Sequence, residues 1–233
     1  MFPHNCINIC ISRRGDSVGL LVLKNTSSIS PNHLIYHYNL TGEAVSGMDS
    51  LKQASEVAIL NANYMMKRLD GYYKSKFVNE NGFCAHEFII DCQEFKNCGI
   101  EVIDISKRLM DYGFHSPTMS WPVISALMIE PTESEDKAEC DRLCDALIQI
   151  REEISMIEEG KLDLHSNPLK MAPHSQEVVC SDNWDRKYTR VMAAYPAIWQ
   201  RTGVVSKFWP SVSRIDDKYG DQNLICSCPS YRK

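Results

Sequence analysis

The sequence has no apolar run long enough to span a membrane. Its longest early run, residues 18–23, is far shorter than the roughly 20 residues that a transmembrane helix needs. Arg13 and Arg14 precede this run, but no small-residue cleavage site of a secretory signal follows it. A transit peptide is rich in arginine, and the first forty residues hold only these two. We therefore expect no membrane segment and no convincing transit peptide in this chain.

A strong excess of charge is also missing. The 233 residues carry a formal net charge of -5, and no run of like charges forms a basic arm or an acidic tail. Binding to a nucleic acid requires a concentrated basic surface, so we expect no nucleic-acid partner. With 44% hydrophobic and 24% charged residues, the composition is that of a globular protein with room for one sizeable core.

The ten cysteines lack the paired short spacings of a zinc site. Their closest spacings are three pairs: Cys6/Cys10, Cys140/Cys144 and Cys226/Cys228. Cys140 and Cys144 lie one turn apart in an amphipathic stretch, which favours burial against a core. Because no secretory signal is present, we expect reduced, structural thiols and no metal. A metal site of N-terminal Cys and His residues is an alternative, and a redox role of Cys226 and Cys228 is a hypothesis.

Helical periodicity begins near Leu51. Apolar residues recur there in steps of three and four up to Leu69, which predicts a helix with one buried face that stops at Gly71. A second helix is predicted over residues 101–112, and Gly113 follows it as a stop.

The third predicted helix is the clearest. Thr132 and Glu135 fit a capping box, an apolar stripe runs from Cys140 to Ile157, and Gly160 ends the pattern. Between the helices, β-branched and aromatic runs predict three strands, at residues 83–91, 118–121 and 126–130.

This order of elements predicts an α+β module over residues 49–160, a small antiparallel or mixed sheet with helices on one face. Residues 1–48 show no sustained period and stay unassigned, with strand or irregular structure near 18–23 and 33–38. Over residues 161–233, prolines and aromatic residues predict a long extended tail that wraps over the module or over a partner.

Seven stretches between Leu51 and Cys228 carry a resemblance in a fixed order: Ala58–Met65, His86–Asp91, Lys107–Val123, Leu127–Ala138, Asn167–His174, Lys207–Pro210 and Tyr219–Cys226. They are similar to the C-terminal part of the P-protein family of the glycine cleavage system, glycine dehydrogenase (decarboxylating). The resemblance implies a fold-type I enzyme, in which a large domain holds pyridoxal phosphate and a small C-terminal domain closes over it. It also implies glycine as the substrate, the lipoyl H-protein and a P-protein homodimer as partners, and a mitochondrial location.

The lysine that binds the cofactor is not recognisable in this chain. In the family it follows a histidine in a His-Leu-Asn-Leu-His-Lys-Thr-Phe type of motif, and no His-Lys dipeptide occurs here. We therefore expect a C-terminal fragment that has no catalytic residue, binds no pyridoxal phosphate alone and is inactive alone. The alternative is a non-catalytic module that binds full-length P-protein or H-protein, which the aromatic tail favours.

The segment Gly113–Thr118 is the best candidate for an active-site contact, since it places a titratable group and a hydroxyl between a helix and a strand. One interpretation has His115 and Thr118 face the cofactor cleft. The other has His115 cap the preceding helix while Pro117 fixes the turn. The sequence leaves both open.

Other polar residues are expected to be structural. We predict buried, hydrogen-bonded side chains for His86 and His174, and a surface salt bridge for Arg108. For three further arginines the sequence leaves open whether they bind a carboxylate or phosphate group: Arg186, Arg190 and Arg214. A core shaped to meet a missing domain should also expose apolar residues and promote self-association.

Overall fold

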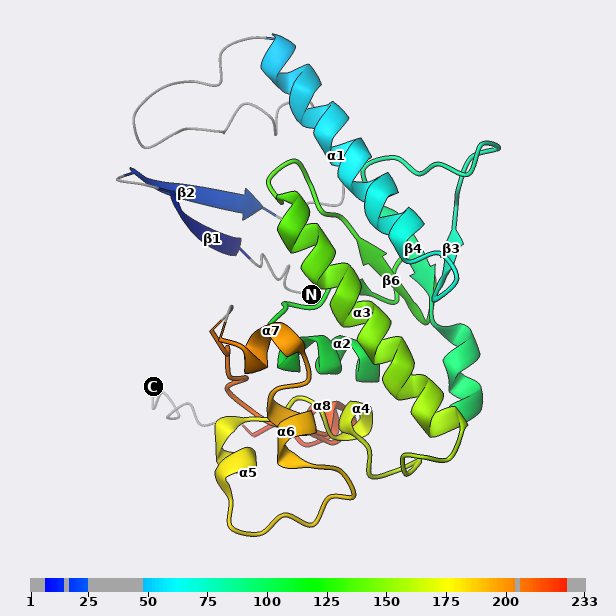
Figure 1. Cartoon of the computed structure of the whole chain (residues 1–233), viewed down its shortest axis with the longest axis vertical. Helices are drawn as coiled ribbons and strands as arrows, with labels where there is room; N and C mark the ends of the chain where they lie inside the picture. Colours follow the sequence, from blue (N-terminus) through cyan, green and yellow to red (C-terminus); the bar gives the residue numbers. More distant parts are fainter. Residues whose placement is uncertain (1–6, 15–16, 25–47, 204–205, 226–233) are drawn as a thin grey trace, which may run out of the picture. The chain divides into compact units, whose positions relative to one another are not determined.

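The computed structural model describes residues 7–14, 17–24, 48–203 and 206–225, with side chains from residue 52 onward (Figure 1). The chain divides into two compact units, residues 1–58 and 59–233. The stretch predicted at 33–38, and Cys226 and Cys228, lie outside the described residues. Among the described helices, none is long and apolar enough to cross a membrane.

The first unit contains an antiparallel hairpin of β1 (Ile7–Arg14) and β2 (Ser17–Lys24). For residues 18–23 the sequence left strand or irregular structure open, and the structure shows a strand. Helix α1 (Met48–Arg68) begins in this unit and continues into the second, and it covers the helix predicted from Leu51.

The second unit is built on an antiparallel sheet of four strands in the order β3-β4-β6-β5. Their bounds are Lys74–Lys76 for β3, Phe88–Asp91 for β4, Thr118–Met119 for β5 and Ala126–Ile129 for β6. The strand predicted at 83–91 starts later because Asn79 folds the preceding residues into a turn. Its side-chain oxygen accepts hydrogen bonds from the amides of Asn81 and Phe83, each 2.9 Å long.

Helices cover one face of this sheet, as predicted. Phe88 and Ile90 of β4 stand opposite Ile129 and Leu127 of β6, and all four side chains belong to the buried core. Most of the other core residues come from α1, from the 3-10 helix η2 (Gln93–Cys98), and from α2 (Val102–Asp111) and α3 (Lys137–Glu158). In Figure 1, α3 runs beside the second half of α1, and Arg68 pairs there with Asp145. The α+β fold class is thereby confirmed.

Cys140 and Cys144 lie in α3 and are buried, as the amphipathic pattern predicted. No group of three or more potential metal ligands occurs among the described residues.

The predicted capping box of α3 is wrong. Asp136 is the N-cap, and its side chain accepts a hydrogen bond of 2.9 Å from the amide of Glu139. Thr132 lies in the preceding loop with a positive φ of 60°. The Asn61 side chain of α1 holds this loop by donating to the carbonyls of Thr132 and Glu135, at 3.0 and 3.1 Å. Helix α3 therefore starts after the residues of the predicted box.

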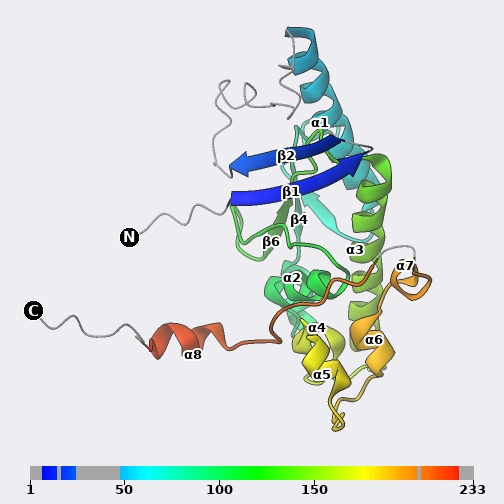
Figure 2. The same ribbon diagram turned by 90° about the vertical axis from the view of Figure 1, so that its left-hand side faces the viewer.

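The segment after residue 160 contains five short helices that the sequence did not predict: α4 (Pro168–Met171), α5 (Gln176–Cys180), α6 (Arg190–Ala194), α7 (Ile198–Arg201) and α8 (Asp217–Gln222). Four of them begin at a side chain that accepts an amide hydrogen bond: Asn167, Ser175, Thr189 and Asp216. Figure 2 shows α4 to α7 grouped near α2, whereas an extended stretch leads away to α8.

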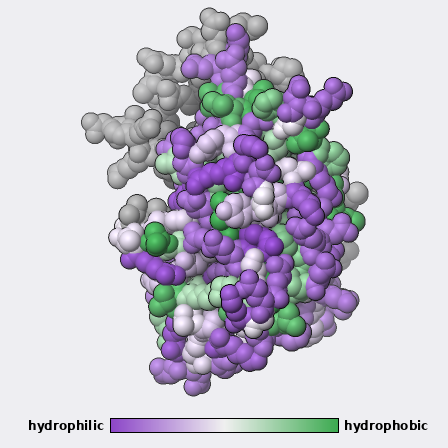
Figure 3. Space-filling model, turned by 45° about the vertical axis from the view of Figure 1, so that its right-hand side comes forward, coloured by the Kyte–Doolittle hydropathy of each residue, from purple (hydrophilic) through white to green (hydrophobic). Residues whose placement is uncertain are grey.

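Exposed apolar side chains gather in a few segments. On the face shown in Figure 3, hydrophilic residues predominate and hydrophobic residues form small separate patches. Large exposed apolar residues occur mainly within 72–83, 119–124 and 208–225. Leu224 and Ile225 are the most open, at 87% and 94% exposure. Such side chains are suited to contacts with other polypeptide.

Candidate functional site

Backbone hydrogen bonds of the turn after α2 end this helix. Gly113 has a φ of 87°, its amide donates to the carbonyl of Met110, and the amide of Phe114 donates to that of Leu109, both at 3.0 Å. His115 is exposed and makes no hydrogen bond or ion pair within the described residues. The interpretation of His115 as a helix cap therefore has no support in the geometry.

Thr118 starts β5 and stands opposite Met128 of β6. Its side chain is exposed, and so are those of the apolar residues that follow it, Met119, Trp121 and Ile124. The segment thus presents an imidazole, a hydroxyl and apolar side chains on one short stretch. His115 and Thr118 are both exposed.

Three side chains hold this segment from behind. The carbonyl of Asp111 accepts hydrogen bonds from Lys207 Nζ at 2.6 Å and from Gln200 Nε2 at 2.8 Å. Arg142 of α3 donates to the carbonyl of Tyr112 at 3.4 Å, and its guanidinium lies 3.8 Å from the centre of the Phe114 ring. Cations at the carboxyl end of a helix also complement its dipole. Residues from α3 and from the C-terminal segment therefore fix the position of the loop.

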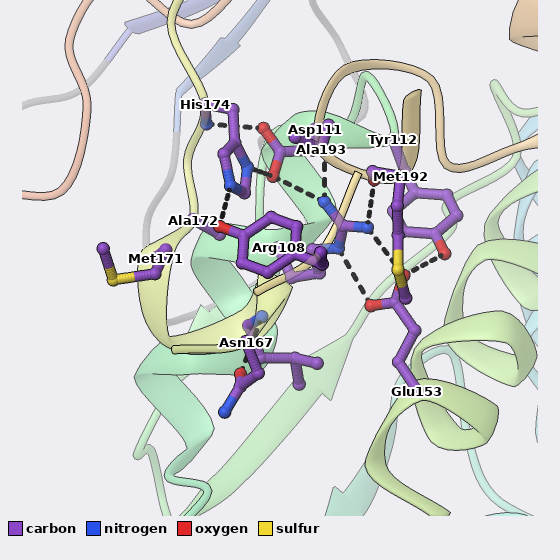
Figure 4. A network of polar contacts seen from close by, with 12 residues as sticks. Arg108, Asp111, Tyr112, Glu153, Asn167, Met171, Ala172, His174, Met192 and Ala193 are labelled. Atoms are coloured by element: carbon purple, nitrogen blue, oxygen red, sulfur yellow. Dashed lines mark hydrogen bonds and ion pairs between the residues drawn. The ribbon is translucent and has the colours of Figure 1, made fainter. Parts of the chain in front are cut away.

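Behind the loop, Arg108 is completely buried in a polar network (Figure 4). It donates to Glu153 at 2.6 and 2.9 Å, to Asp111 at 2.9 Å, and to the carbonyls of Met192 and Ala193 at 2.8 and 3.2 Å. The prediction of a surface salt bridge is wrong, because α3 and α6 cover this side of α2. Burial alone would lower the pKa of Arg108, but Glu153 and Asp111 outweigh it and hold that pKa above its usual value.

His174 joins the same network. Its Nδ1 lies 2.7 Å from Asp111 Oδ2, its Nε2 lies 2.7 Å from the Tyr188 hydroxyl, and its amide donates to Asp111 Oδ1 at 2.7 Å. Burial lowers the pKa of His174 despite the nearby carboxylate. A neutral ring then donates from Nδ1 to Asp111 and accepts from Tyr188. The prediction of a buried, hydrogen-bonded His174 is confirmed.

The corresponding prediction for His86 is wrong. His86 is only partly buried and makes no hydrogen bond within the part of the chain that the structure describes. The reason is the late start of β4, which leaves His86 in the loop before the strand.

The three arginines considered for carboxylate or phosphate binding all have internal partners. Arg186 donates to the Tyr188 hydroxyl at 3.0 Å and Arg190 to the carbonyl of Ser181 at 2.7 Å. Arg214 pairs with the carboxylate of Asp104, 110 residues away in sequence. These contacts tie the C-terminal segment to itself and to α2, so they explain the arginines without a ligand.

Neither the lysines of the groove beside β3 nor Lys207 fits a pyridoxal phosphate site by itself. A Schiff-base lysine must face a cavity with an available amine. An open groove of about 760 Å³ lies beside β3, but its two lysines are ion-paired, Lys67 with Asp70 and Lys74 with Glu94. Burial lowers the pKa of Lys207 to about 8, yet its ammonium is bonded to the carbonyl of Asp111.

Comparison with known proteins identifies the family. The family model described as glycine dehydrogenase, C-terminal domain, matches residues 54–174. Glycine dehydrogenase (decarboxylating), mitochondrial, of Gallus gallus is 59% identical over 184 residues, which are 78% of this chain and 18% of that protein. The Pisum sativum protein of that name is 56% identical over 195 residues, 83% of this chain and 18% of that protein.

A bacterial relative matches this chain with a similar identity and coverage. Glycine dehydrogenase (decarboxylating) of Prochlorococcus marinus (strain NATL2A) is 59% identical over 185 residues, 79% of this chain and 19% of that protein. The chain thus spans less than a fifth of the length of the curated relatives that it matches. It belongs to the glycine dehydrogenase (decarboxylating) family and corresponds to the C-terminal part of its P-protein members.

Proposed function

We propose that the chain acts as the small C-terminal domain of a glycine-decarboxylating P-protein and contributes to catalysis only together with the part that carries pyridoxal phosphate. The observation that carries this proposal is the 59% identity over 184 residues to a relative of which these residues form only 18%. The chain would then share the family's substrate, glycine, and its acceptor, the lipoyl H-protein. Several relatives are named mitochondrial, which supports the same location.

Within that enzyme, the segment Gly113–Thr118 would close over the cofactor cleft, with His115 and Thr118 toward it. Both side chains are exposed, and neither has a partner within the described residues. The segment is fixed from behind by Lys207, Gln200 and Arg142. An exposed loop on a rigid support is the usual setting of binding and catalytic residues. The cofactor would supply the electron sink for decarboxylation, and this chain would orient the substrate and exclude water.

A chimera tests this proposal directly. The matched residues of the Gallus gallus protein are replaced by those of this chain, and glycine decarboxylation is measured with lipoylated H-protein. We expect activity within about tenfold of the relative, since most of the segment is identical. An inactive chimera that folds and binds pyridoxal phosphate would contradict the proposal.

The role of His115 is tested in the same chimera. The His115→Ala variant should lower kcat by about tenfold to a hundredfold if the ring acts in the cleft. His165 is an equally exposed histidine outside the candidate segment, so His165→Ala is the matched control and should leave the rate unchanged. Equal rates for both variants would remove His115 from the site.

A non-catalytic interaction module is the second candidate, and one observation favours it. The stretch from residue 206 to 225 contains six apolar or aromatic residues that are each more than half exposed: Phe208, Val212, Ile215, Tyr219, Leu224 and Ile225. Such an arm is suited to contact with another polypeptide. Co-purification of the separate chain with full-length P-protein, or with H-protein, would support this function, and a lone monomer in both mixtures would contradict it.

A further inference from the structure

The residues of helix α2 fall on three sides of the helix, and each side has different surroundings. Successive residues turn by about 100°, so residues three and four apart share a side. The side of Ile105 and Leu109 lies in the core, and the side of Arg108 and Asp111 lies in the polar network. The remaining side carries four residues: Ile103, Ser106, Lys107 and Met110. In both ribbon views α2 lies between the sheet and α4, and Figure 2 shows it from the side turned away from α3.

On this third side, which we call the open side of α2, Lys107 lacks an acceptor. Between residues 52 and 225, every arginine has an acceptor for its guanidinium, and only three lysines make neither an ion pair nor a hydrogen bond: Lys96, Lys107 and Lys218. Lys96 and Lys218 are exposed to solvent, which hydrates them. Lys107 is partly buried, so it is the one partly buried cation without a partner in this range.

Ser106 beside it also lacks a partner. Only 8% of the residue is exposed, and its hydroxyl makes no hydrogen bond within the described residues. In contrast, the Ser155 hydroxyl of α3 donates back to the carbonyl of Arg151 at 3.2 Å. Trp199 Nε1 is the one fully enclosed side-chain N or O atom without a partner in the described chain, so the Ser106 hydroxyl is not sealed in.

We propose that the open side of α2 binds a small oxyanion, a carboxylate or a phosphate ester, through the Lys107 ammonium and the Ser106 hydroxyl. An ammonium and a hydroxyl on adjacent residues can donate to two oxygens of one such group. Ile103 and Met110 lie on the same side of the helix.

The existence of this site stands on the geometry of α2 alone. Its assignment to the carboxylate of glycine or to the phosphate of the cofactor rests on the proposed function. A chimera without activity whose open side still binds an oxyanion would reject the proposed function and retain the site. An active chimera without oxyanion binding would reject only the site.

The test is an NMR titration of the full chain with acetate, glycine and inorganic phosphate as separate probes. We expect saturable shifts of the Ser106, Lys107 and Met110 amides with at least one probe. Saturation with phosphate alone assigns a phosphate ester, saturation with acetate and glycine alone assigns a carboxylate, and both results support the site.

Variants complete the test. Lys107→Gln and Ser106→Ala should each weaken binding by about tenfold or more, the loss expected for a charge-assisted hydrogen bond. Lys107→Arg should retain saturable binding, and Lys96→Gln is the matched control that should change nothing. Thermal unfolding confirms that each variant is folded. Two results would overturn the proposal. One is chemical shifts that change linearly with probe concentration, without saturation, at many surface lysines. The other is equal affinity of Lys107→Gln and the wild type for the probe.

Discussion

Asp111 and His174 lie 63 residues apart in sequence, and the carboxylate of Asp111 contacts both the ring and the backbone amide of His174 at 2.7 Å. The same carboxylate pairs with Arg108. One side chain at the end of α2 therefore fixes the C-terminal segment against the helix that leads to His115.

Removing Arg108 should destabilise the fold strongly. The Arg108→Met variant leaves Glu153 and Asp111 buried without their cation, which should cost about 3–5 kcal/mol in the free energy of unfolding. Urea unfolding followed by circular dichroism measures this. Lys67→Met removes an exposed partner of Asp70 and should have little effect. Equally small effects of the two changes would show that the network does not stabilise the fold.

His174 should make stability depend on pH. Its pKa in the folded chain lies below the ordinary 6.5, so the unfolded chain binds the proton more readily. This contribution to stability is complete above pH 6.5 and is lost as the pH falls from there toward the folded pKa. The slope from one proton cannot exceed about 1.4 kcal/mol per pH unit.

Urea unfolding between pH 7.5 and 5 checks this, at pH values spaced by about half a unit around the ordinary histidine pKa. His174→Gln should flatten the dependence, whereas His165→Gln, at an exposed site, should keep the wild-type slope. An unchanged slope in His174→Gln would mean that the ring is free to protonate in the folded chain.

Lys207 should titrate far below an ordinary lysine. Burial lowers its pKa from 10.5 to about 8, while the hydrogen bond with Glu94 raises the pKa of Lys74. NMR of side-chain-labelled lysines should therefore show one amine that titrates near pH 8 and is absent from Lys207→Met. Loss of this cation should also speed amide exchange at Gly113 and Phe114. Unchanged exchange would show that Lys207 does not hold the loop.

The position of the α3 cap can be tested by two substitutions. Asp136→Ala removes the acceptor for the amide of Glu139 and should cost about 1 kcal/mol. Thr132→Ala should cost less than half as much, since Thr132 lies before the helix. The reverse order of the two effects would restore the capping box predicted from the sequence.

The long elements could be predicted from the sequence because their periodicity is local. In helices α1, α2 and α3, apolar residues recur at helical spacing along the whole length of the helix, which is 21, 10 and 22 residues. Helices α4 to α8 have four to six residues each, too few for a pattern to stand out. Their N-caps at Asn167, Ser175 and Thr189 are the local signal that could have found them.

The site residues were harder to predict because their surroundings come from distant sequence. His115 and Thr118 were proposed from a turn between a helix and a strand, and their role in a site stays a prediction. The burial of Arg108 depends on Glu153 and on carbonyls of α6, 45 to 85 residues later. Lys107 and Ser106 were overlooked for the same reason, since only the covering of the other two sides of α2 shows which side stays open.

The most direct test of the central claim is whether the separate chain binds pyridoxal phosphate. The purified chain is mixed with the cofactor, reduced with borohydride and searched for pyridoxyl-lysine by mass spectrometry. We predict no stoichiometric adduct on any one lysine, because the cofactor site would lie in the part of the enzyme outside this chain. A stoichiometric adduct on a single lysine, such as Lys207, would contradict the account and show a cofactor site within these residues.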